Sequence, residues 1–125
     1  MTTTQAPAQL AELYLATWNE TDPAARRALI DTSWTADLRY TDPLVEVAGP
    51  EALDATIAAV QQQFPGWVFS LGETGVDAHH RQARFTWNLG PAGGEALVVG
   101  FDVVTTDEEG RIATVLGFLD KVPAV

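Results

Sequence analysis

The first half of the chain has apolar residues spaced three and four positions apart, which is the pattern of amphipathic helices. The predicted helices cover residues 6–19, 19–34 and 48–66. Asp22 and Pro23 favour the start of the second helix, because aspartate caps free N–H groups and proline fits the first helical position. Residues 37–43 form a short predicted strand that ends at Pro43, since proline cannot continue a central ladder.

The second half changes to a period of two, which is the pattern of half-buried strands. The predicted strands cover residues 67–76, 80–89, 96–107 and 111–120. This order predicts an α+β fold in which three N-terminal helices pack on one face of a curved, mostly antiparallel sheet. A curved sheet closed by helices has the shape of a cone, and the mouth of a cone is a natural pocket for a small molecule.

Length and composition fit one domain over residues 1–125 with its own hydrophobic core. No apolar run is long enough to cross a membrane, and the N-terminus lacks the features of a secretory signal, so we expect a cytoplasmic protein. The absence of cysteine excludes disulfides, thiolate metal sites and a cysteine nucleophile. His79 and His80 fall at a predicted turn without convincing partner ligands, so we expect no metal site.

The formal net charge of −10 comes from 17 acidic residues against 7 lysines and arginines. Nucleic acids and anionic membranes are therefore not expected as partners, because phosphate binding needs clustered positive charge. The acidity is typical of a surface that favours solubility. The expected ligand is instead a small apolar molecule in the mouth of the cone.

Asp102 interrupts an otherwise apolar strand, ALVVGFDVV at residues 96–104. Val98, Gly100 and Val104 share its face, and the opposite face is apolar as well, so neither face obviously meets water. A buried carboxylate needs compensation. Asp102 is therefore an edge residue turned to water, a structural hydrogen-bond acceptor, or a carboxyl group working in a pocket.

Two other polar residues stand out by their context. Tyr14 lies on the apolar face of the first predicted helix, where a tyrosine is usually part of the core. Asp42 ends the first predicted strand, where an aspartate before proline is usually a turn residue. Spacing along the sequence does not by itself bring these two residues together with Asp102.

Three stretches, LYLATWNETD, RYTDPLVEVAGPEAL and VVGFDVVTTDEEGRIATVLGF, resemble ketosteroid isomerases and SnoaL-like polyketide cyclases of the nuclear transport factor 2-like superfamily. The resemblance covers nearly the whole chain in the order of its elements. It is most specific at the tyrosine four residues before WN, at the Asp-Pro pair before a helix that glycine leads, and at the aspartate in the strand before the final hairpin. It implies the cone-shaped fold described above.

The resemblance also implies a cofactor-independent enzyme that moves a proton on an apolar cyclic carbonyl compound. Asp42 corresponds to the general acid/base, and Tyr14 and a protonated Asp102 correspond to the groups that donate hydrogen bonds to the developing oxyanion. These residue types suit the chemistry, because preorganised donors in a dry pocket stabilise negative charge on oxygen. The residues expected to shape the substrate pocket are Trp18, Phe85, Trp87, Val115 and Leu119.

The tyrosines around this site depart from the isomerase pattern. Those enzymes support the oxyanion tyrosine with further tyrosines, whereas Ile57 and Trp34 stand near the expected positions and the only other tyrosine is Tyr40. The alternative function is a non-catalytic small-molecule-binding or assembly protein of the same fold, in which Asp102 is a structural acceptor and Asp42 is a turn residue. The resemblance further implies a homodimer formed through the outer face of the sheet.

Overall fold

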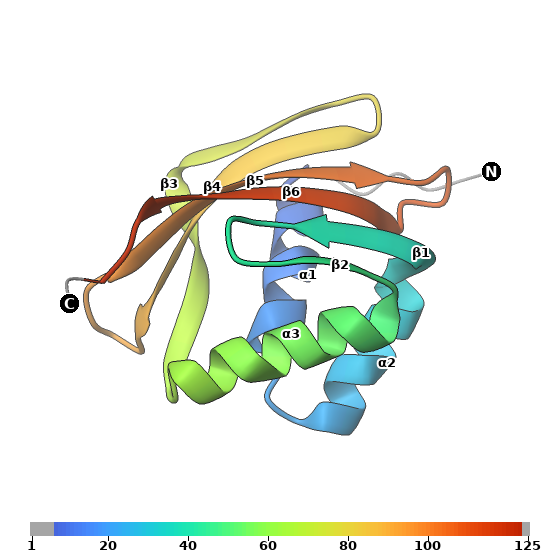
Figure 1. The fold of residues 1–125 in the computed structure, drawn as a ribbon. Coiled ribbons are helices and arrows are strands. Elements are labelled where there is room, and N and C mark those ends of the chain that lie inside the picture. The colour runs from blue at the N-terminus through green and yellow to red at the C-terminus, as the bar shows by residue number, and fades with distance from the viewer. Residues whose placement is uncertain (1–6, 124–125) are drawn as a thin grey trace.

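The computed structural model describes residues 7–123, in which three helices pack on one face of a single six-stranded sheet (Figure 1). The helices are α1 (Pro7–Asn19), α2 (Pro23–Ser33) and α3 (Pro50–Gln63). The strands are β1 (Trp34–Thr41), β2 (Glu46–Ala48), β3 (Trp67–His79), β4 (Gln82–Pro91), β5 (Val98–Thr106) and β6 (Ile112–Lys121). The predicted α+β class is therefore confirmed. Residue 6, where the first helix is predicted to begin, lies outside the described residues.

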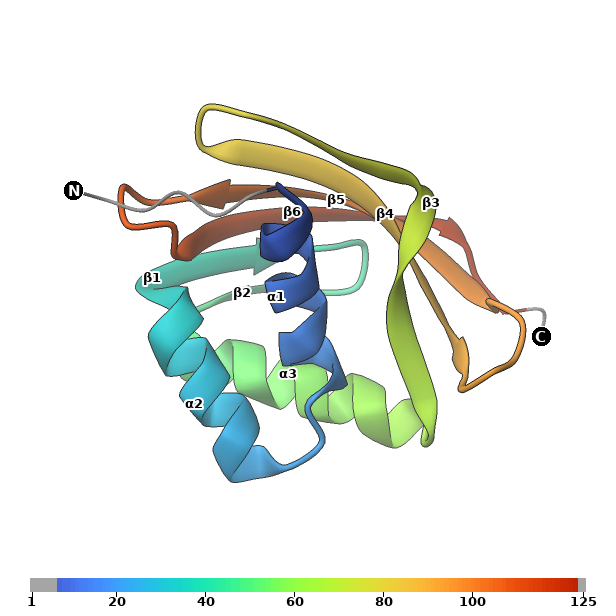
Figure 2. The same ribbon diagram turned by 180° about the vertical axis from the view of Figure 1, so that it is seen from behind.

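The strands follow the order β2-β1-β6-β5-β4-β3, and every neighbouring pair is antiparallel except β1 and β6, which are parallel. The sheet curves around the helices, and its outer face carries no helix (Figures 1 and 2). Strand β2 was not predicted, because three residues are too few to show a period of two. Within residues 7–123, no helix is both long and apolar enough to cross a membrane.

The helices begin and end where the local sequence favours it. The Asp22 side chain accepts a hydrogen bond of 2.9 Å from the backbone N–H of Ala25, which confirms the predicted start of α2. Helix α3 starts after Gly49, whose φ of 89° lies in a region that favours glycine. Trp34, predicted as the last residue of the second helix, is instead its C-cap and begins β1.

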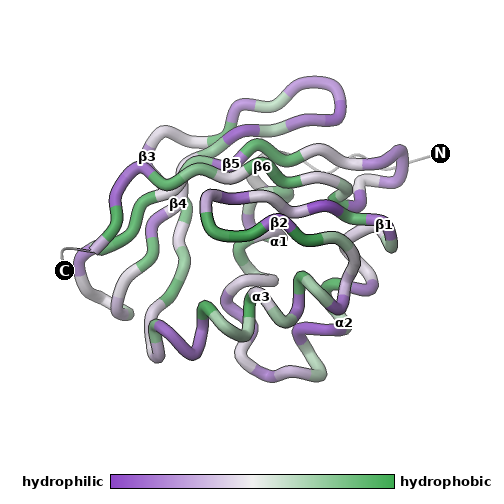
Figure 3. The backbone as a smooth tube through the Cα atoms, viewed as in Figure 1, coloured by the Kyte–Doolittle hydropathy of each residue, from purple (hydrophilic) through white to green (hydrophobic). Residues whose placement is uncertain are grey.

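The core lies between the helices and the inner face of the sheet. Along β4 the inward positions Ala83, Phe85, Trp87 and Leu89 are all buried, which confirms the predicted alternation. Hydrophobic residues occupy much of the sheet, and hydrophilic residues form the β3–β4 hairpin turn (Figure 3). Burial of these apolar residues is the main favourable contribution to the free energy of folding, and it packs the inner face of the sheet against the helices.

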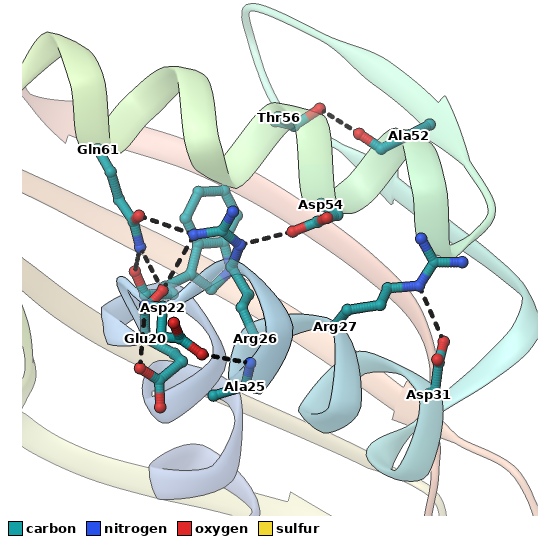
Figure 4. Close-up of polar contacts among 11 residues, drawn as sticks. Glu20, Asp22, Ala25, Arg26, Arg27, Asp31, Ala52, Asp54, Thr56 and Gln61 are labelled. Carbon is teal, nitrogen blue, oxygen red and sulfur yellow. Dashed lines mark hydrogen bonds and ion pairs between the residues drawn. The ribbon is translucent and has the colours of Figure 1, made fainter.

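A buried polar cluster fixes the three helices against one another (Figure 4). Arg26, only 4% exposed, donates from Nε to Asp54 Oδ1 at 2.5 Å, and from Nη1 to Gln61 Oε1 at 2.9 Å and to the Glu20 carbonyl at 3.1 Å. Gln61 Nε2 donates at 2.9 Å to the carbonyls of both Trp18 and Glu20. We call this set the helix cluster. It holds the end of α1, and with it the backbone of Trp18, against α2 and α3.

Candidate active site

A cavity of about 240 Å³ opens between the inner face of the sheet and helices α1 and α3. Its walls are mostly apolar. The apolar side chains from the helices and strands that line it include Val60, Phe64, Phe69, Leu89 and Leu119. At its rim lie three exposed apolar residues, Leu44, Phe118 and Val122. Tyr14, Asp42 and Asp102 all line this one cavity, although they come from distant parts of the sequence.

The strand register explains how the two aspartates meet. Asp102 on β5 is paired with Gly117 on β6, and β1, which leads to Asp42, is the next strand beyond β6. A Cβ atom at Gly117 would lie 2.9 Å from Asp102 Oδ1 and 3.4 Å from the Cβ of Asp42. The absence of a side chain at Gly117 therefore leaves room for both carboxyl groups in the same cavity.

Asp102 faces inward and is 1% exposed, which excludes the possibility that it is an edge residue turned to water. Its Oδ2 atom has no hydrogen-bond partner among the described residues. Burial raises the pKa of this carboxyl from 3.8 to about 6; the nearby donors of Tyr14 and Trp87 favour the ionised form and act to lower it, and the charge of Asp42 adds to the rise. The shift is in the direction expected for a hydrogen-bond donor, but at pH 7 most of the carboxyl is still ionised.

Tyr14 is 2% exposed and is held by aromatic neighbours on both sides. Its ring centroid lies 5.5 Å from that of Phe85, in an edge-to-face arrangement, and 5.7 Å from that of Trp34. Burial, followed by the charge of Asp102, raises the pKa of the Tyr14 hydroxyl well above its ordinary value. The hydroxyl therefore stays protonated across the physiological range and remains able to donate.

Asp42 is held by three donors. Its Oδ1 accepts the backbone N–H groups of Leu44 at 2.8 Å and Val45 at 2.9 Å, and its Oδ2 accepts the Tyr40 hydroxyl at 2.7 Å. Burial, followed by the charge of Asp42, raises the pKa of Tyr40, which keeps this hydroxyl a donor. A carboxylate has about four acceptor positions. Asp42 is thus fixed in orientation and retains capacity for one further proton.

The residues predicted to shape the substrate pocket divide into two groups. Trp18, Trp87 and Leu119 line the cavity. Phe85 and Val115 do not line it, because both are buried in the core, with Phe85 packed against the ring of Tyr14. Their predicted contact with a ligand is corrected to a supporting position in the core.

Among the residues of the site that sequence reasoning missed, three differ in the signal that the sequence gives for them. Tyr40 has a signal in hindsight, because alternation along β1 places it on the same face as Asp42, two residues later. Gly117 has a weaker signal, a glycine inside a buried strand, which often marks the close approach of another group. Phe69 has no signal of its own, since its place in the cavity depends on the curvature of β3 over α1.

Comparison with known proteins shows which family the chain belongs to. A family model of the SnoaL-like domain matches residues 11–115. A solved structure of a proposed isomerase of the SnoaL-like family from Agrobacterium tumefaciens is 42% identical, covers 91% of this chain and 97% of that chain, and has a TM-score of 0.86. No curated protein matches the chain.

Two more distant structures are similar in fold. A proposed ketosteroid isomerase from Kribbella flavida is 23% identical, covers 100% of this chain and 85% of that chain, and has a TM-score of 0.69. A proposed SnoaL-like polyketide cyclase from Jannaschia is 19% identical, covers 94% of this chain and 91% of that chain, and also has a TM-score of 0.69. The family model and the 42% identical Agrobacterium structure mean that the chain belongs to the SnoaL-like family.

Proposed function

We propose that this protein is a cofactor-independent isomerase or cyclase that moves a proton on an apolar cyclic carbonyl compound. One observation carries the proposal: Tyr14, Asp42 and Asp102 line a single, mostly apolar cavity that opens to the surface. A base and two potential oxyanion donors in such a cavity are the groups that enolisation of a carbonyl requires. The names of the solved isomerase and cyclase relatives support the same reaction class.

In the proposed reaction, Asp42 removes a proton from a carbon next to the carbonyl group of the substrate. The electron pair of the broken C–H bond moves onto the carbonyl oxygen, which becomes an enolate. Tyr14 and Asp102 donate hydrogen bonds to this oxygen. The protonated Asp42 then returns the proton to the same or another carbon, so that the enzyme ends in its starting state.

The raised pKa of Asp102 makes it suitable for this role only when the substrate is bound. With a pKa of about 6, the carboxyl is mostly ionised at pH 7. Negative charge that develops on a nearby oxygen favours the protonated carboxyl, because two like charges in a poorly solvated site repel each other. The proton that Asp102 donates is taken from solvent water when the substrate binds and returns to water when the product leaves; the charge on the enolate oxygen stabilises this neutral form in between.

Exchange of carbon-bound hydrogen tests the proposal. The measurement is exchange of the hydrogens at C2 of 1-tetralone, and of the acidic hydrogens of a panel of cyclic enones, for deuterium in D2O, followed by NMR. Asp42→Asn is expected to lower the catalysed rate about 10²–10⁴-fold while ligand affinity stays near wild type. Asp37→Asn, which changes an exposed aspartate on β1, the strand that leads to Asp42, is the matched control and should keep the wild-type rate. An unchanged rate in Asp42→Asn would remove Asp42 from the mechanism.

The second candidate function is a binding or assembly protein without catalysis. The three donors on Asp42 favour it, because an aspartate that accepts backbone N–H groups two and three residues later is typical of a turn. The same experiment separates the two functions. Binding of the ring compounds without any catalysed exchange would favour the second function.

We also propose that the protein forms a homodimer through the outer face of the sheet. Leu116 and Phe118 are 46% and 55% exposed on β6, and Phe118 contacts Phe101 of the neighbouring strand β5. Exposed apolar side chains grouped on a helix-free face are typical of an interface. Sedimentation equilibrium measures the mass directly, and a monomer at all concentrations would contradict the proposal.

A further inference from the structure

The cavity contains buried polar atoms without partners, and two of them belong to side chains that the proposed reaction does not use. The structure describes four buried side-chain nitrogen or oxygen atoms without a hydrogen-bond partner, and three of them belong to residues that line the cavity. These three are Asp102 Oδ2 and the indole Nε1 atoms of Trp18 and Trp87. The Trp87 indole lies close enough to Asp102, and the Trp18 indole close enough to Tyr14, to lower the pKa of that group, but neither N–H makes a hydrogen bond of standard geometry. A buried donor without a partner costs about 1–3 kcal/mol, so each such atom needs an explanation.

Of the other two tryptophans only Trp34 is buried, and its indole has a partner. Trp34 is 2% exposed and does not line the cavity, and its Nε1 donates to Thr17 Oγ1 at 3.3 Å. Trp67 is half-buried outside the cavity and stacks on Phe64 with ring centroids 4.5 Å apart. The two indoles without partners are thus the two that border the cavity, where a ligand can reach them.

Close packing holds both indoles in place. The Trp87 ring lies directly over Gly100, where an added Cβ atom would come within 2.0 Å of it. Phe69 packs between the two indoles, with its ring centroid 5.5 Å from that of Trp18 and 5.3 Å from that of Trp87. The backbone of Trp18 is fixed in turn by the helix cluster. The two donors are therefore preorganised.

We propose that the indole N–H groups of Trp18 and Trp87 donate hydrogen bonds to oxygen atoms of a neutral ligand of one or two fused rings. The proposal rests on the proposed function, because it names the ligand class of the same cavity. We call Tyr14, Asp102 and the two indole N–H groups the cavity floor. The Tyr14 hydroxyl and the two indole N–H groups are donors. A ligand that bears carbonyl or hydroxyl oxygens therefore satisfies indole atoms that are otherwise unpaired.

Size and charge define the ligand further. A cavity of about 150 Å³ holds a benzene molecule, whereas pockets for drug-sized molecules have volumes of about 300 Å³ or more. A volume of about 240 Å³ therefore fits one ring or two fused rings better than a larger ring system. No lysine, arginine or histidine of the described residues lines the cavity, whereas Asp42 and Asp102 do. An anionic ligand would be repelled, so the ligand oxygen atoms that the indole donors meet belong to neutral carbonyl or hydroxyl groups.

A pair of probes that differ by one oxygen tests the proposal. 1-Tetralone is a neutral bicyclic ketone, and tetralin is the same ring system without the oxygen. Their dissociation constants are measured by calorimetry for the wild type and for Trp18→Phe, Trp87→Phe and the double variant. The wild type should bind tetralone more tightly, and the double variant should lose about fivefold or more of this preference, since one hydrogen bond contributes about 1 kcal/mol. Trp67→Phe, which removes an indole outside the cavity, should keep it.

The wild type provides a readout that does not depend on the folding of a variant. Each of the four tryptophans gives one indole N–H signal by NMR, and the single Phe variants assign them. Tetralone should move the signal of Trp18, Trp87 or both downfield, and tetralin should not. The proposal is overturned if both probes have the same effect on these signals, or if the double variant keeps the wild-type preference within twofold.

The experiments distinguish failure of the proposed function from failure of this inference. If tetralone moves the indole signals but the protein catalyses no exchange at its C2 position, the two indoles bind oxygen and the enzyme proposal falls. If exchange depends on Asp42 while the indole signals respond equally to both probes, the enzyme proposal stands and this inference falls.

Discussion

The helix cluster and the cavity floor are two buried polar regions of the same small domain, and they differ in how completely their atoms are paired. In the helix cluster, the charged side chain of Arg26 meets a carboxylate, an amide oxygen and a carbonyl. At the cavity floor, three buried polar atoms have no partner. Trp18 belongs to both regions, because its carbonyl is bound by Gln61 and its indole N–H is free.

The difference shows what each region contributes. Polar atoms that are fully paired on burial fix the geometry of the elements that carry them, whereas unpaired atoms lower stability and persist where something else can pair them. Substitutions in the helix cluster should therefore act mainly on the free energy of unfolding. Substitutions at the cavity floor should act on ligand binding and on the pH dependence of stability.

Arg26→Met breaks the helix cluster and should have the largest effect on stability. It removes the donors to Asp54, Gln61 and the Glu20 carbonyl, and it leaves the carboxylate of Asp54 without its cation. Breaking a buried ion pair costs about 3–5 kcal/mol, and because Asp54 is 24% exposed we expect about 3–4 kcal/mol. Urea unfolding at pH 7, followed by tryptophan fluorescence, measures the change.

Arg27→Met is the matched control for this substitution. Arg27 pairs with Asp31 on the same helix, but the two side chains are 43% and 54% exposed. Water screens such a pair, so its loss should change the free energy of unfolding by less than about 1 kcal/mol. Equal effects of the two substitutions would mean that the helix cluster adds no more to stability than a surface ion pair does.

Asp102→Asn tests the cavity floor through pH. The folded protein raises the pKa of Asp102 from 3.8 to about 6, so it binds this proton more tightly than the unfolded chain. The resulting stabilisation is complete below about pH 4 and is lost as the pH rises to about 6. At 1.36 kcal/mol for each unit, the loss is about 2–3 kcal/mol.

The variant has no proton to lose at this position. Its stability relative to the wild type should therefore increase by about 2–3 kcal/mol between pH 4 and pH 7, as measured by urea unfolding of both proteins across this range. Other carboxyl groups titrate in both proteins, so their contributions cancel in the difference. Parallel curves for the two proteins would show that the buried carboxyl does not bind its proton more tightly in the folded state.

The sequence predicts the elements of this fold well because their signals are local. Helix α2 begins where Asp22 and Pro23 indicate, and β4 alternates as its residues predict. The meeting of Asp42 with Asp102 is not local. It depends on the parallel pairing of β1 with β6 and on the missing side chain at Gly117, neither of which has a periodic signal.

The same limit of local sequence patterns explains why Phe85 is predicted to line the pocket but lies in the core. Phe85 and Trp87 share one face of β4, so alternation assigns both to the interior and cannot separate them. The packing of α1 on the sheet decides the outcome, because Tyr14 covers Phe85 while Trp87 stays open to the cavity. The residues of the candidate site itself were identified by resemblance to a family, since chemistry does not follow from a hydrophobic pattern.

Tyr40→Phe should have the smallest effect of these substitutions. Tyr40 lines the cavity, but its hydroxyl is paired, so the substitution tests whether a paired polar group in the cavity serves structure or function. Its hydroxyl donates to Asp42 at 2.7 Å, and its ring lies 5.4 Å from that of Trp18, a contact that phenylalanine keeps. Without this donor, Oδ2 of Asp42 loses its partner and the carboxylate is held through Oδ1 alone. The rate of tetralone exchange at pH 7 should therefore fall by about fivefold or less, since one hydrogen bond contributes about 1 kcal/mol, with tetralone affinity unchanged.

The two possible roles of Tyr40 differ in their effect on this rate. If the hydroxyl positions the base, the exchange rate falls while tetralone affinity is retained, because the carboxylate is no longer held through both of its oxygen atoms. If Tyr40 acts only through packing, the rate does not change, because phenylalanine keeps the ring. The second result would mean that the N–H groups of Leu44 and Val45 suffice to hold Asp42, and that pairing inside the cavity serves structure as it does in the helix cluster.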